Sequence, residues 1–156
     1  MKWERGRVLP SLSRLDIPEK NIHITIIVIL GAQRLYRTFV ETHFTAAHQL
    51  VGYPGHCGRL HGHTWKVRIE VETESVDALG LSIDFKELMR IVHIPIDRLD
   101  HFHINEIHPF DKENPTAENL ARYIFSNVKN SLPPGVKACN VTVWESDKYG
   151  VLYSES

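Results

Sequence analysis

The sequence predicts an α+β fold, in which a four-stranded antiparallel sheet carries two helices inserted between its two hairpins. Residues 64–72 alternate strictly between apolar and polar side chains, which is typical of an antiparallel strand with one buried face. Two segments with helical periodicity follow, and two strand-like segments end the chain. Helices grouped between hairpins, and not alternating with every strand, argue against a doubly wound parallel sheet.

Four segments are predicted to be strands. Residues 36–44 are strand-like by composition, and residues 64–72 show the clearest period of two. Val141 and Val143 indicate a third strand, and residues 149–153 can pair with it as a hairpin.

Two segments are predicted to be helices. The first covers about 85–93, where Asp84 and Glu87 resemble a capping box and Pro95 is expected to end the helix. The second begins near Pro115 and runs to about residue 131, with its apolar residues on one side.

Composition limits the class of protein. The chain has 156 residues, 42% hydrophobic and 24% charged, which fits one globular domain. Its formal charge of -1 gives no electrostatic support for binding to nucleic acid or to an anionic membrane. Two cysteines exclude a disulfide scaffold and favour a reducing, cytoplasmic compartment, whereas the 10 histidines are unusual.

Residues 1–33 differ from the rest and are interpreted as an N-terminal extension of unknown role, ahead of a functional domain at 34–156. The apolar run 22–30 is too short to span a bilayer as a helix, which takes about 20 residues. Asp16 and Glu19 lie close before that run and argue against a secretory signal. We expect an extra strand or a segment outside the core fold.

Three histidines are predicted to meet at one end of the first hairpin. His48 lies just past the first strand and His61 and His63 lie just before the second, so pairing of these strands brings them together. His61 and His63 are two residues apart and point the same way in an extended backbone. Three neutral imidazoles favour zinc and leave a coordination position open for substrate or water.

Cys57, in the loop between these strands, allows two interpretations. As a fourth ligand it would close a structural zinc site that staples the hairpin. As a free thiolate beside the metal it would act as a nucleophile or base. The spacing does not decide between them.

Two acidic positions further along the chain are candidates for the site. Glu145 shares parity with the apolar residues of its strand, so its carboxylate is expected to face inward, outside the histidine cluster, unless the strand already ends at Val143. Asp100 precedes His101 and could orient its imidazole or simply cap a turn.

Five motifs occur together in one order along residues 36–153. They are Phe44-Thr-Ala-Ala-His48, Cys57-Gly-Arg-Leu-His61-Gly-His63, Leu99-Asp-His101, Pro115-Thr-Ala-Glu-Asn119 and Val143-Trp-Glu145. Together they resemble the 6-pyruvoyl-tetrahydropterin synthase family. The short spacing from Cys57 to the His-Gly-His pair resembles the bacterial 6-carboxy-tetrahydropterin synthases of queuosine biosynthesis.

The resemblance implies a tunnelling fold, in which subunits form barrel-shaped trimers that stack into a homohexamer. It implies that His48, His61 and His63 bind a zinc ion. It further implies a small-molecule pterin triphosphate as substrate, with no nucleic-acid or membrane partner.

The same resemblance assigns the remaining site residues. Cys57, Asp100 and His101 would transfer protons, Glu145 would bind the pterin ring, and Thr116 would line its pocket. The implied reaction converts 7,8-dihydroneopterin triphosphate to 6-carboxy-5,6,7,8-tetrahydropterin, with release of acetaldehyde and triphosphate. A pyruvoyl-type or other pterin side-chain lyase is the alternative, and a non-catalytic zinc-stapled binding module is a more remote one.

Overall fold

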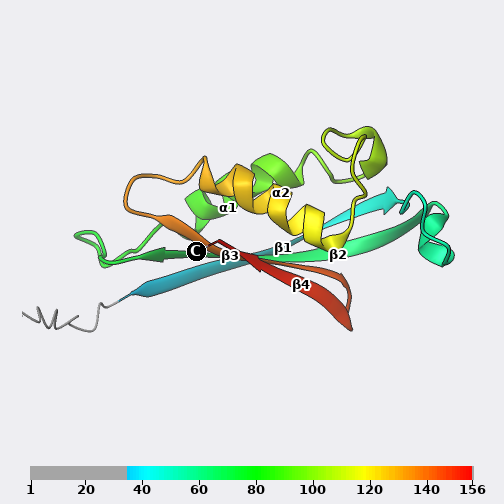
Figure 1. Cartoon of the computed structure of the whole chain (residues 1–156). Helices are drawn as coiled ribbons and strands as arrows, with labels where there is room; N and C mark the ends of the chain where they lie inside the picture. Colours follow the sequence, from blue (N-terminus) through cyan, green and yellow to red (C-terminus); the bar gives the residue numbers. More distant parts are fainter. Residues whose placement is uncertain (1–34, 156) are drawn as a thin grey trace, which may run out of the picture. The chain divides into compact units, whose positions relative to one another are not determined.

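The computed structural model describes residues 35–155, so the predictions for residues 1–33 lie outside the described range. Two hairpins enclose two helices along the chain, which confirms the predicted α+β class (Figure 1). The elements are β1 (Tyr36–His48), a short 3-10 helix η1 (His56–Gly58), β2 (His61–Thr73), α1 (Phe85–Ile96), a second 3-10 helix η2 (Ile104–Glu106), α2 (Ala117–Lys129), β3 (Lys137–Ser146) and β4 (Tyr149–Ser154).

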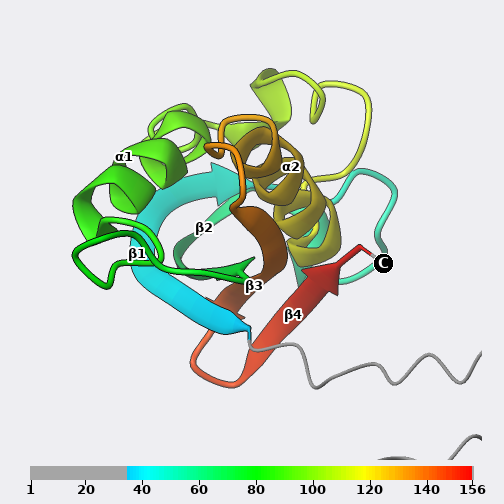
Figure 2. The same cartoon turned by 90° about the vertical axis from the view of Figure 1, so that its left-hand side faces the viewer.

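The four strands form one antiparallel sheet in the order β1-β2-β3-β4. Both helices lie on the same face of this sheet, and the strands curve around them (Figure 1, Figure 2). Along residues 35–155 we find no helix that is both long and apolar enough to cross a membrane.

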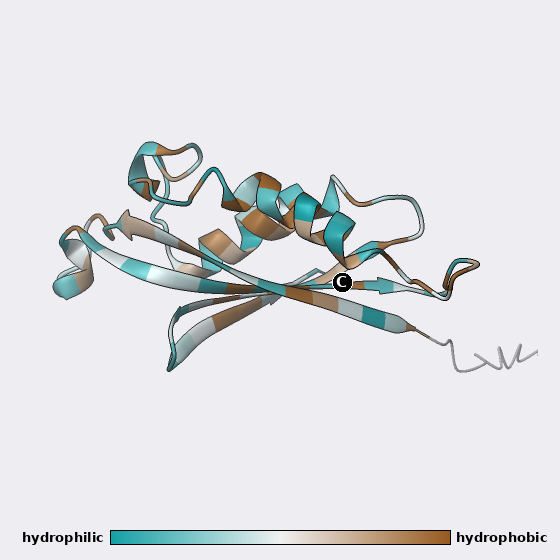
Figure 3. Cartoon of the chain, turned by 180° about the vertical axis from the view of Figure 1, so that it is seen from behind, coloured by the Kyte–Doolittle hydropathy of each residue, from teal (hydrophilic) through white to brown (hydrophobic). Residues whose placement is uncertain are grey.

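The core lies between the sheet and the two helices. Strand residues alternate between hydrophobic and hydrophilic along the sheet (Figure 3). The alternation predicted for 64–72 is confirmed, because Trp65, Val67, Ile69 and Val71 are all fully buried. Each such side chain contributes roughly 1.5–3 kcal/mol on burial, so the face toward the helices is fixed strongly.

The strands of the first hairpin are longer than their composition indicates. β1 continues to His48 and β2 begins at His61, and these two residues pair directly across the hairpin. The segment 45–47 contains two alanines, which have little intrinsic strand preference, so pairing with β2 determines its conformation.

The helix boundaries are close to those predicted, with one error. The Asp84 side chain accepts hydrogen bonds from the backbone N–H groups of Lys86 and Glu87, which confirms the predicted start of α1. The expectation that Pro95 ends α1 is wrong, because the helix includes Pro95 and ends at Ile96. Pro95 lies in the last turn, where its missing N–H costs one helical bond, and it is buried in the core.

Candidate metal centre and adjoining pocket

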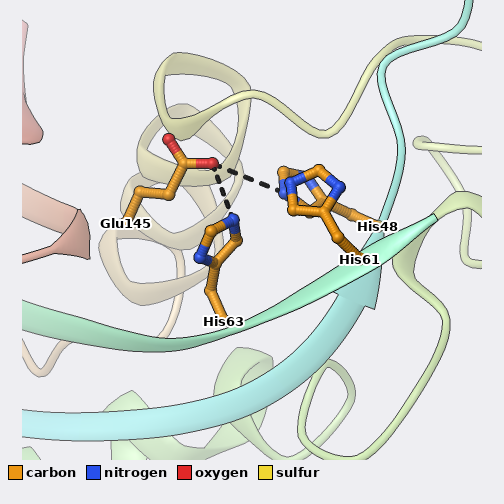
Figure 4. Close-up of side chains that lie close together, drawn as sticks. All are labelled: His48, His61, His63 and Glu145. Atoms are coloured by element: carbon orange, nitrogen blue, oxygen red, sulfur yellow. Dashed lines mark ion pairs between the residues drawn. The ribbon is translucent and has the colours of Figure 1, made fainter. Parts of the chain in front are cut away.

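Three imidazoles meet where β1 ends and β2 begins. His48 is the last residue of β1 and lies opposite His61, while His63 follows two residues later on the same face of β2. The ring centroids are 4.5 Å apart for His48 and His61, 4.8 Å for His61 and His63, and 5.2 Å for His48 and His63. The structure thus places these three residues together, as the sequence predicts (Figure 4).

The Nε2 atoms of these histidines are buried and have no hydrogen-bond partner. Nδ1 of His48 donates to the carbonyl of Pro115 at 2.9 Å, and Nδ1 of His61 donates to the carbonyl of Arg59 at 2.7 Å. Because a carbonyl oxygen can only accept, each neutral ring keeps a lone pair on Nε2. Orientation of a ligand histidine by a hydrogen bond at its other nitrogen is typical of metal sites.

Glu145 contributes a fourth donor atom to this cluster. Its Oε1 lies 3.1 Å from Nε2 of His63 and 3.5 Å from Nε2 of His48, and the donor atoms of all four residues lie within 4.8 Å of one another (Figure 4). The inward parity predicted for Glu145 is confirmed, since β3 continues to Ser146. The expectation that Glu145 lies outside the histidine cluster is wrong.

An irregularity in the sheet explains the position of Glu145. Trp144 pairs with Gly150 and Ser146 pairs with Tyr149, so Glu145 lies in a register shift between β3 and β4. Such bulges bend a strand and redirect one side chain. Here the shift directs the carboxylate toward the two strands of the first hairpin.

The electrostatic surroundings favour neutral imidazoles. Burial lowers the pKa of His48 below its ordinary value, although the Pro115 carbonyl and Glu145 oppose this shift. Burial also lowers the pKa of His63, against the opposing charge of Glu145. Neutral imidazole nitrogens and a carboxylate oxygen that converge in this way are ligands that fit a divalent cation of the zinc type.

A buried tryptophan forms the floor of the histidine cluster. Trp65 is fully buried, and its ring lies edge-on to His48 at 4.9 Å and to His63 at 5.4 Å between centroids. The sequence predicts Trp65 only as an inward strand residue; its contact with the two imidazoles follows from its sharing a face with His61 and His63 on β2. This packing restricts the rings and excludes water beneath them.

Cys57 lies on the wall of a cavity of about 560 Å³ next to the histidines. This cavity is lined by His56, Cys57, Arg59, Leu60, His61, His63, Glu145, Ser146 and Tyr149. Cys57 does not belong to the group of donor atoms that lie within 4.8 Å of one another. The geometry therefore favours a thiol beside the metal over a fourth metal ligand.

A second cavity of about 360 Å³ adjoins the first. It is lined in part by Thr116, and Glu145 and Tyr149 line both cavities. Thr116 is also the N-cap of α2, where its hydroxyl accepts from the Asn119 N–H at 3.3 Å. The helix start therefore fixes the position of Thr116 on the pocket wall.

Asp100 and His101 lie elsewhere, on the edge of β1 that faces away from β2. Asp100 accepts the Thr45 N–H at 2.8 Å, and the His101 N–H donates to the Thr45 carbonyl. The Thr45 N–H holds the pKa of Asp100 below its ordinary value, helped by His101, whose Nδ1 lies 2.9 Å from Oδ2. Neither residue lines the cavity beside Cys57.

The backbone of His101 has a positive φ of 63°, the one such non-glycine residue in the described part of the chain. Conformations of this kind are sparsely populated for residues other than glycine and cluster at functional sites. The His101 side chain is 79% exposed. Its imidazole is therefore held by Asp100 and presented outward from the subunit.

Comparison with known proteins agrees with this geometry. The family model described as 6-pyruvoyl tetrahydropterin synthase matches residues 37–156. The chain belongs to this family. A solved structure, the 6-pyruvoyl tetrahydropterin synthase of Caenorhabditis elegans, is similar with a TM-score of 0.71 and 24% identity over 80% of this chain and 98% of its own, which supports the fold.

Curated relatives of this family member carry two different names. A putative 6-carboxy-5,6,7,8-tetrahydropterin synthase of Archaeoglobus fulgidus is 36% identical over 69% of this chain and 86% of its own length. The 6-carboxy-5,6,7,8-tetrahydropterin synthase of Haemophilus influenzae is 27% identical over 78% of this chain and 100% of its own. A dihydroneopterin monophosphate aldolase of Pyrococcus furiosus is 36% identical over 59% of this chain and 75% of its own.

Substitution of one ligand tests the metal centre directly. We expect His61→Ala to bind well below one metal ion per chain, because the two remaining imidazoles hold a divalent ion far more weakly than three do. Elemental analysis after gel filtration measures the metal content. His108→Ala is the control, since His108 is exposed and pairs with Asp111, outside the histidine cluster. Full metal occupancy in His61→Ala would contradict the site.

Proposed function

We propose that this chain is a zinc-dependent 6-carboxy-5,6,7,8-tetrahydropterin synthase that acts in the cytoplasm, in queuosine biosynthesis. Its substrate is 7,8-dihydroneopterin triphosphate, and its by-products are acetaldehyde and triphosphate. The observation that carries the proposal is the convergence of three buried Nε2 atoms beside a cavity whose wall holds a free cysteine. The curated relatives that carry this enzyme name add support.

The proposed catalytic domain is 34–156, with residues 1–33 as an extension of unknown role. The family match begins at residue 37, which agrees with this division. Two free cysteines, Cys57 and Cys139, suit a reducing compartment.

The proposed chemistry divides between the metal centre and the protein side chains. His48, His61 and His63 would hold the zinc ion, which supplies Lewis-acid polarisation of the substrate's side-chain oxygens. Cys57 removes a proton from the adjacent carbon, since a thiolate is a suitable base at neutral pH. His101, oriented by Asp100, would give a proton to another position of the side chain, and proton exchange with water would then restore both Cys57 and His101.

Glu145 is proposed to bind the pterin ring, with Thr116 beside it. A pterin presents an amino group and a ring N–H along one edge, and a carboxylate can accept both hydrogen bonds at once. Glu145 lines both cavities and its side chain is 32% exposed, so it can reach a bound ring.

A second candidate function is cleavage of a pterin side chain without formation of a carboxylate. The relative from Pyrococcus furiosus named dihydroneopterin monophosphate aldolase favours it, at 36% identity. A retro-aldol cleavage would release a phosphorylated aldehyde in place of acetaldehyde and triphosphate. A pyruvoyl-type synthase on the same fold would release triphosphate and retain all side-chain carbons on the ring.

Product analysis distinguishes these functions. Zinc-loaded protein is incubated separately with the triphosphate and the monophosphate of 7,8-dihydroneopterin, and pterin products and aldehydes are identified by mass spectrometry. We expect a 6-carboxy pterin with acetaldehyde and triphosphate from the first substrate. A phosphorylated aldehyde from the monophosphate, with no carboxy product from the triphosphate, would support the aldolase instead.

A conservative change at Glu145 tests its proposed role. Glu145→Gln keeps the size of the side chain but places an amide N–H₂ where two acceptors are needed. Because a charge-assisted hydrogen bond contributes about 1.5–3 kcal/mol, pterin affinity should fall at least tenfold. Calorimetry with a pterin and metal analysis are run on one preparation, and metal content should remain near one per chain. Loss of metal with unchanged pterin affinity would show that Glu145 is a ligand.

We further propose that the active site is completed between subunits of a homohexamer. Asp100 and His101 lie on the outer edge of β1, away from the cavity that Cys57 lines. β1 and β4 are the two edges of the described sheet. The part of the β1 edge before Thr45, which Asp100 and His101 do not occupy, is a template for pairing with another chain. A neighbouring subunit at this edge would bring its own cavity to the Asp100–His101 pair.

Co-expression of two inactive variants tests the shared site. Cys57→Ala and His101→Asn should each bind metal and lack turnover, because each removes one proton-transfer group. In randomly mixed oligomers, about a quarter of the sites combine an intact Cys57 from one chain with an intact His101 from its neighbour. About a quarter of normal activity should therefore return. Asparagine tolerates the positive φ at this position.

Co-expression of Cys57→Ala with His61→Ala is the matched control. Cys57 and His61 line the same cavity of one chain, so every site in these mixtures carries a defect and no activity should return. Failure of the Cys57→Ala and His101→Asn pair to recover would place each complete site within one subunit.

A further inference from the structure

The loop that carries Cys57 has little hydrophobic support. It connects β1 to β2 over residues 49–60 and contains only the short helix η1, which has no buried residue. Ordering such a segment costs backbone conformational entropy at every residue. Polar contacts must therefore hold the loop in place.

Two asparagine side chains bind alternate residues at the start of this loop. Asn105 accepts the Gln49 N–H and donates Nδ2 to the Gln49 carbonyl, both at 2.9 Å. Asn114 accepts the Val51 N–H at 2.7 Å and donates to the Val51 carbonyl at 3.0 Å. A carboxamide offers the same donor and acceptor as a peptide group, so each asparagine replaces one residue of a neighbouring strand.

These contacts determine which way the residue between them faces. Successive backbone groups of an extended segment point to opposite sides. The Leu50 N–H therefore points away from the two asparagines, and it donates to the Cys57 carbonyl at 2.8 Å. The Leu50 carbonyl in turn accepts the Tyr53 N–H at 3.1 Å. Residues 49–51 thus link the two asparagines to the backbone of Cys57 through hydrogen bonds.

The segment that holds Asn114 also orients a metal ligand. The Asn114 carbonyl accepts the Asn119 side-chain Nδ2 and the Thr116 N–H, each at 2.8 Å. The next residue, Pro115, accepts the Nδ1–H of His48. One rigid turn at the start of α2 therefore fixes both the lone pair of His48 and the loop that carries the thiol.

We propose that Asn105 and Asn114, the asparagine clamp, are positioning residues that hold the Cys57 thiol at the metal centre. The inference rests on the proposed function in one respect, the use of Cys57 as the base. Neither asparagine lines the cavity beside Cys57. Both act through the backbone of residues 49–51.

The test compares Asn105→Ala and Asn114→Ala with Asn127→Ala as the control. Asn127 donates its amide to the Tyr123 carbonyl within α2, at 2.8 Å, far along the chain from the loop. All variants carry Cys139→Ser, so that Cys57 is the sole thiol. Hydrogen exchange of the peptide 49–58 and alkylation of Cys57 by iodoacetamide are measured, together with metal content and kcat.

Both clamp variants should exchange hydrogen in peptide 49–58 and react with iodoacetamide at least about tenfold faster than the control, because one hydrogen-bonded constraint is lost. Exchange in the four strands and the metal content should stay at the control level, and kcat should fall at least tenfold. Asn105→Asp, which keeps the acceptor and loses the donor, should be intermediate.

Exchange and alkylation rates equal to those of the control in both clamp variants would overturn the proposal. If a variant does not fold, hydrogen exchange of the unsubstituted protein still tests the proposal. A Leu50 amide that exchanges without protection would contradict the clamp. Absence of pterin turnover in the unsubstituted protein, with a normal clamp response in exchange and alkylation, would reject the proposed function and retain the positioning role.

Discussion

Antiparallel pairing of β1 with β2 places the candidate metal ligands, because His48 lies directly opposite His61 in that register. The two strands bury the same face against the helices, with Phe44 and Trp65 packed together below the histidines. A slip of one residue would turn the buried side chains of a strand toward the solvent. The hydrophobic core therefore fixes the register, and the register fixes the imidazoles on one buried face.

The rest of the site is assembled around this pair of strands from distant parts of the chain. A register shift at the β3–β4 turn directs Glu145 to the imidazoles, and the start of α2 supplies the Pro115 carbonyl that orients His48. Cys57 comes from a loop held by polar contacts. Rigid elements thus hold the metal ligands, whereas the proposed base lies on a segment that core packing does not hold.

Much of this arrangement could be predicted from periodicity. The alternation in 64–72 identifies the buried face of β2, and parity alone places His61 and His63 together and turns Glu145 inward. The contact of Glu145 with the histidines could not be predicted, because a bulge depends on pairing with β4 and leaves no pattern within its own strand. The sequence does not predict the extension of β1 to His48 for a similar reason. Pairing with β2, more than composition, makes residues 45–48 part of the strand.

Long-range hydrogen bonds are the feature that is hardest to predict from the sequence. Asn105 and Asn114 bind backbone more than 50 residues away, and no local pattern distinguishes them from ordinary turn residues. The sequence pairs Asp100 with His101 correctly, yet their place on the outer edge of β1 depends on how the segment after α1 packs beside Thr45. Adjacent positions in the sequence show which groups can act together, whereas the fold shows on which surface of the chain they lie.

The central claim is that three imidazoles bind the metal and that Cys57 stays outside the coordination sphere. X-ray absorption at the zinc edge of the zinc-loaded protein tests it most directly. The account predicts nitrogen and oxygen scatterers at about 2.0–2.1 Å, with the multiple-scattering pattern of three imidazoles. A sulfur scatterer at about 2.3 Å would contradict it, because Cys57 would then be a ligand of a closed structural site.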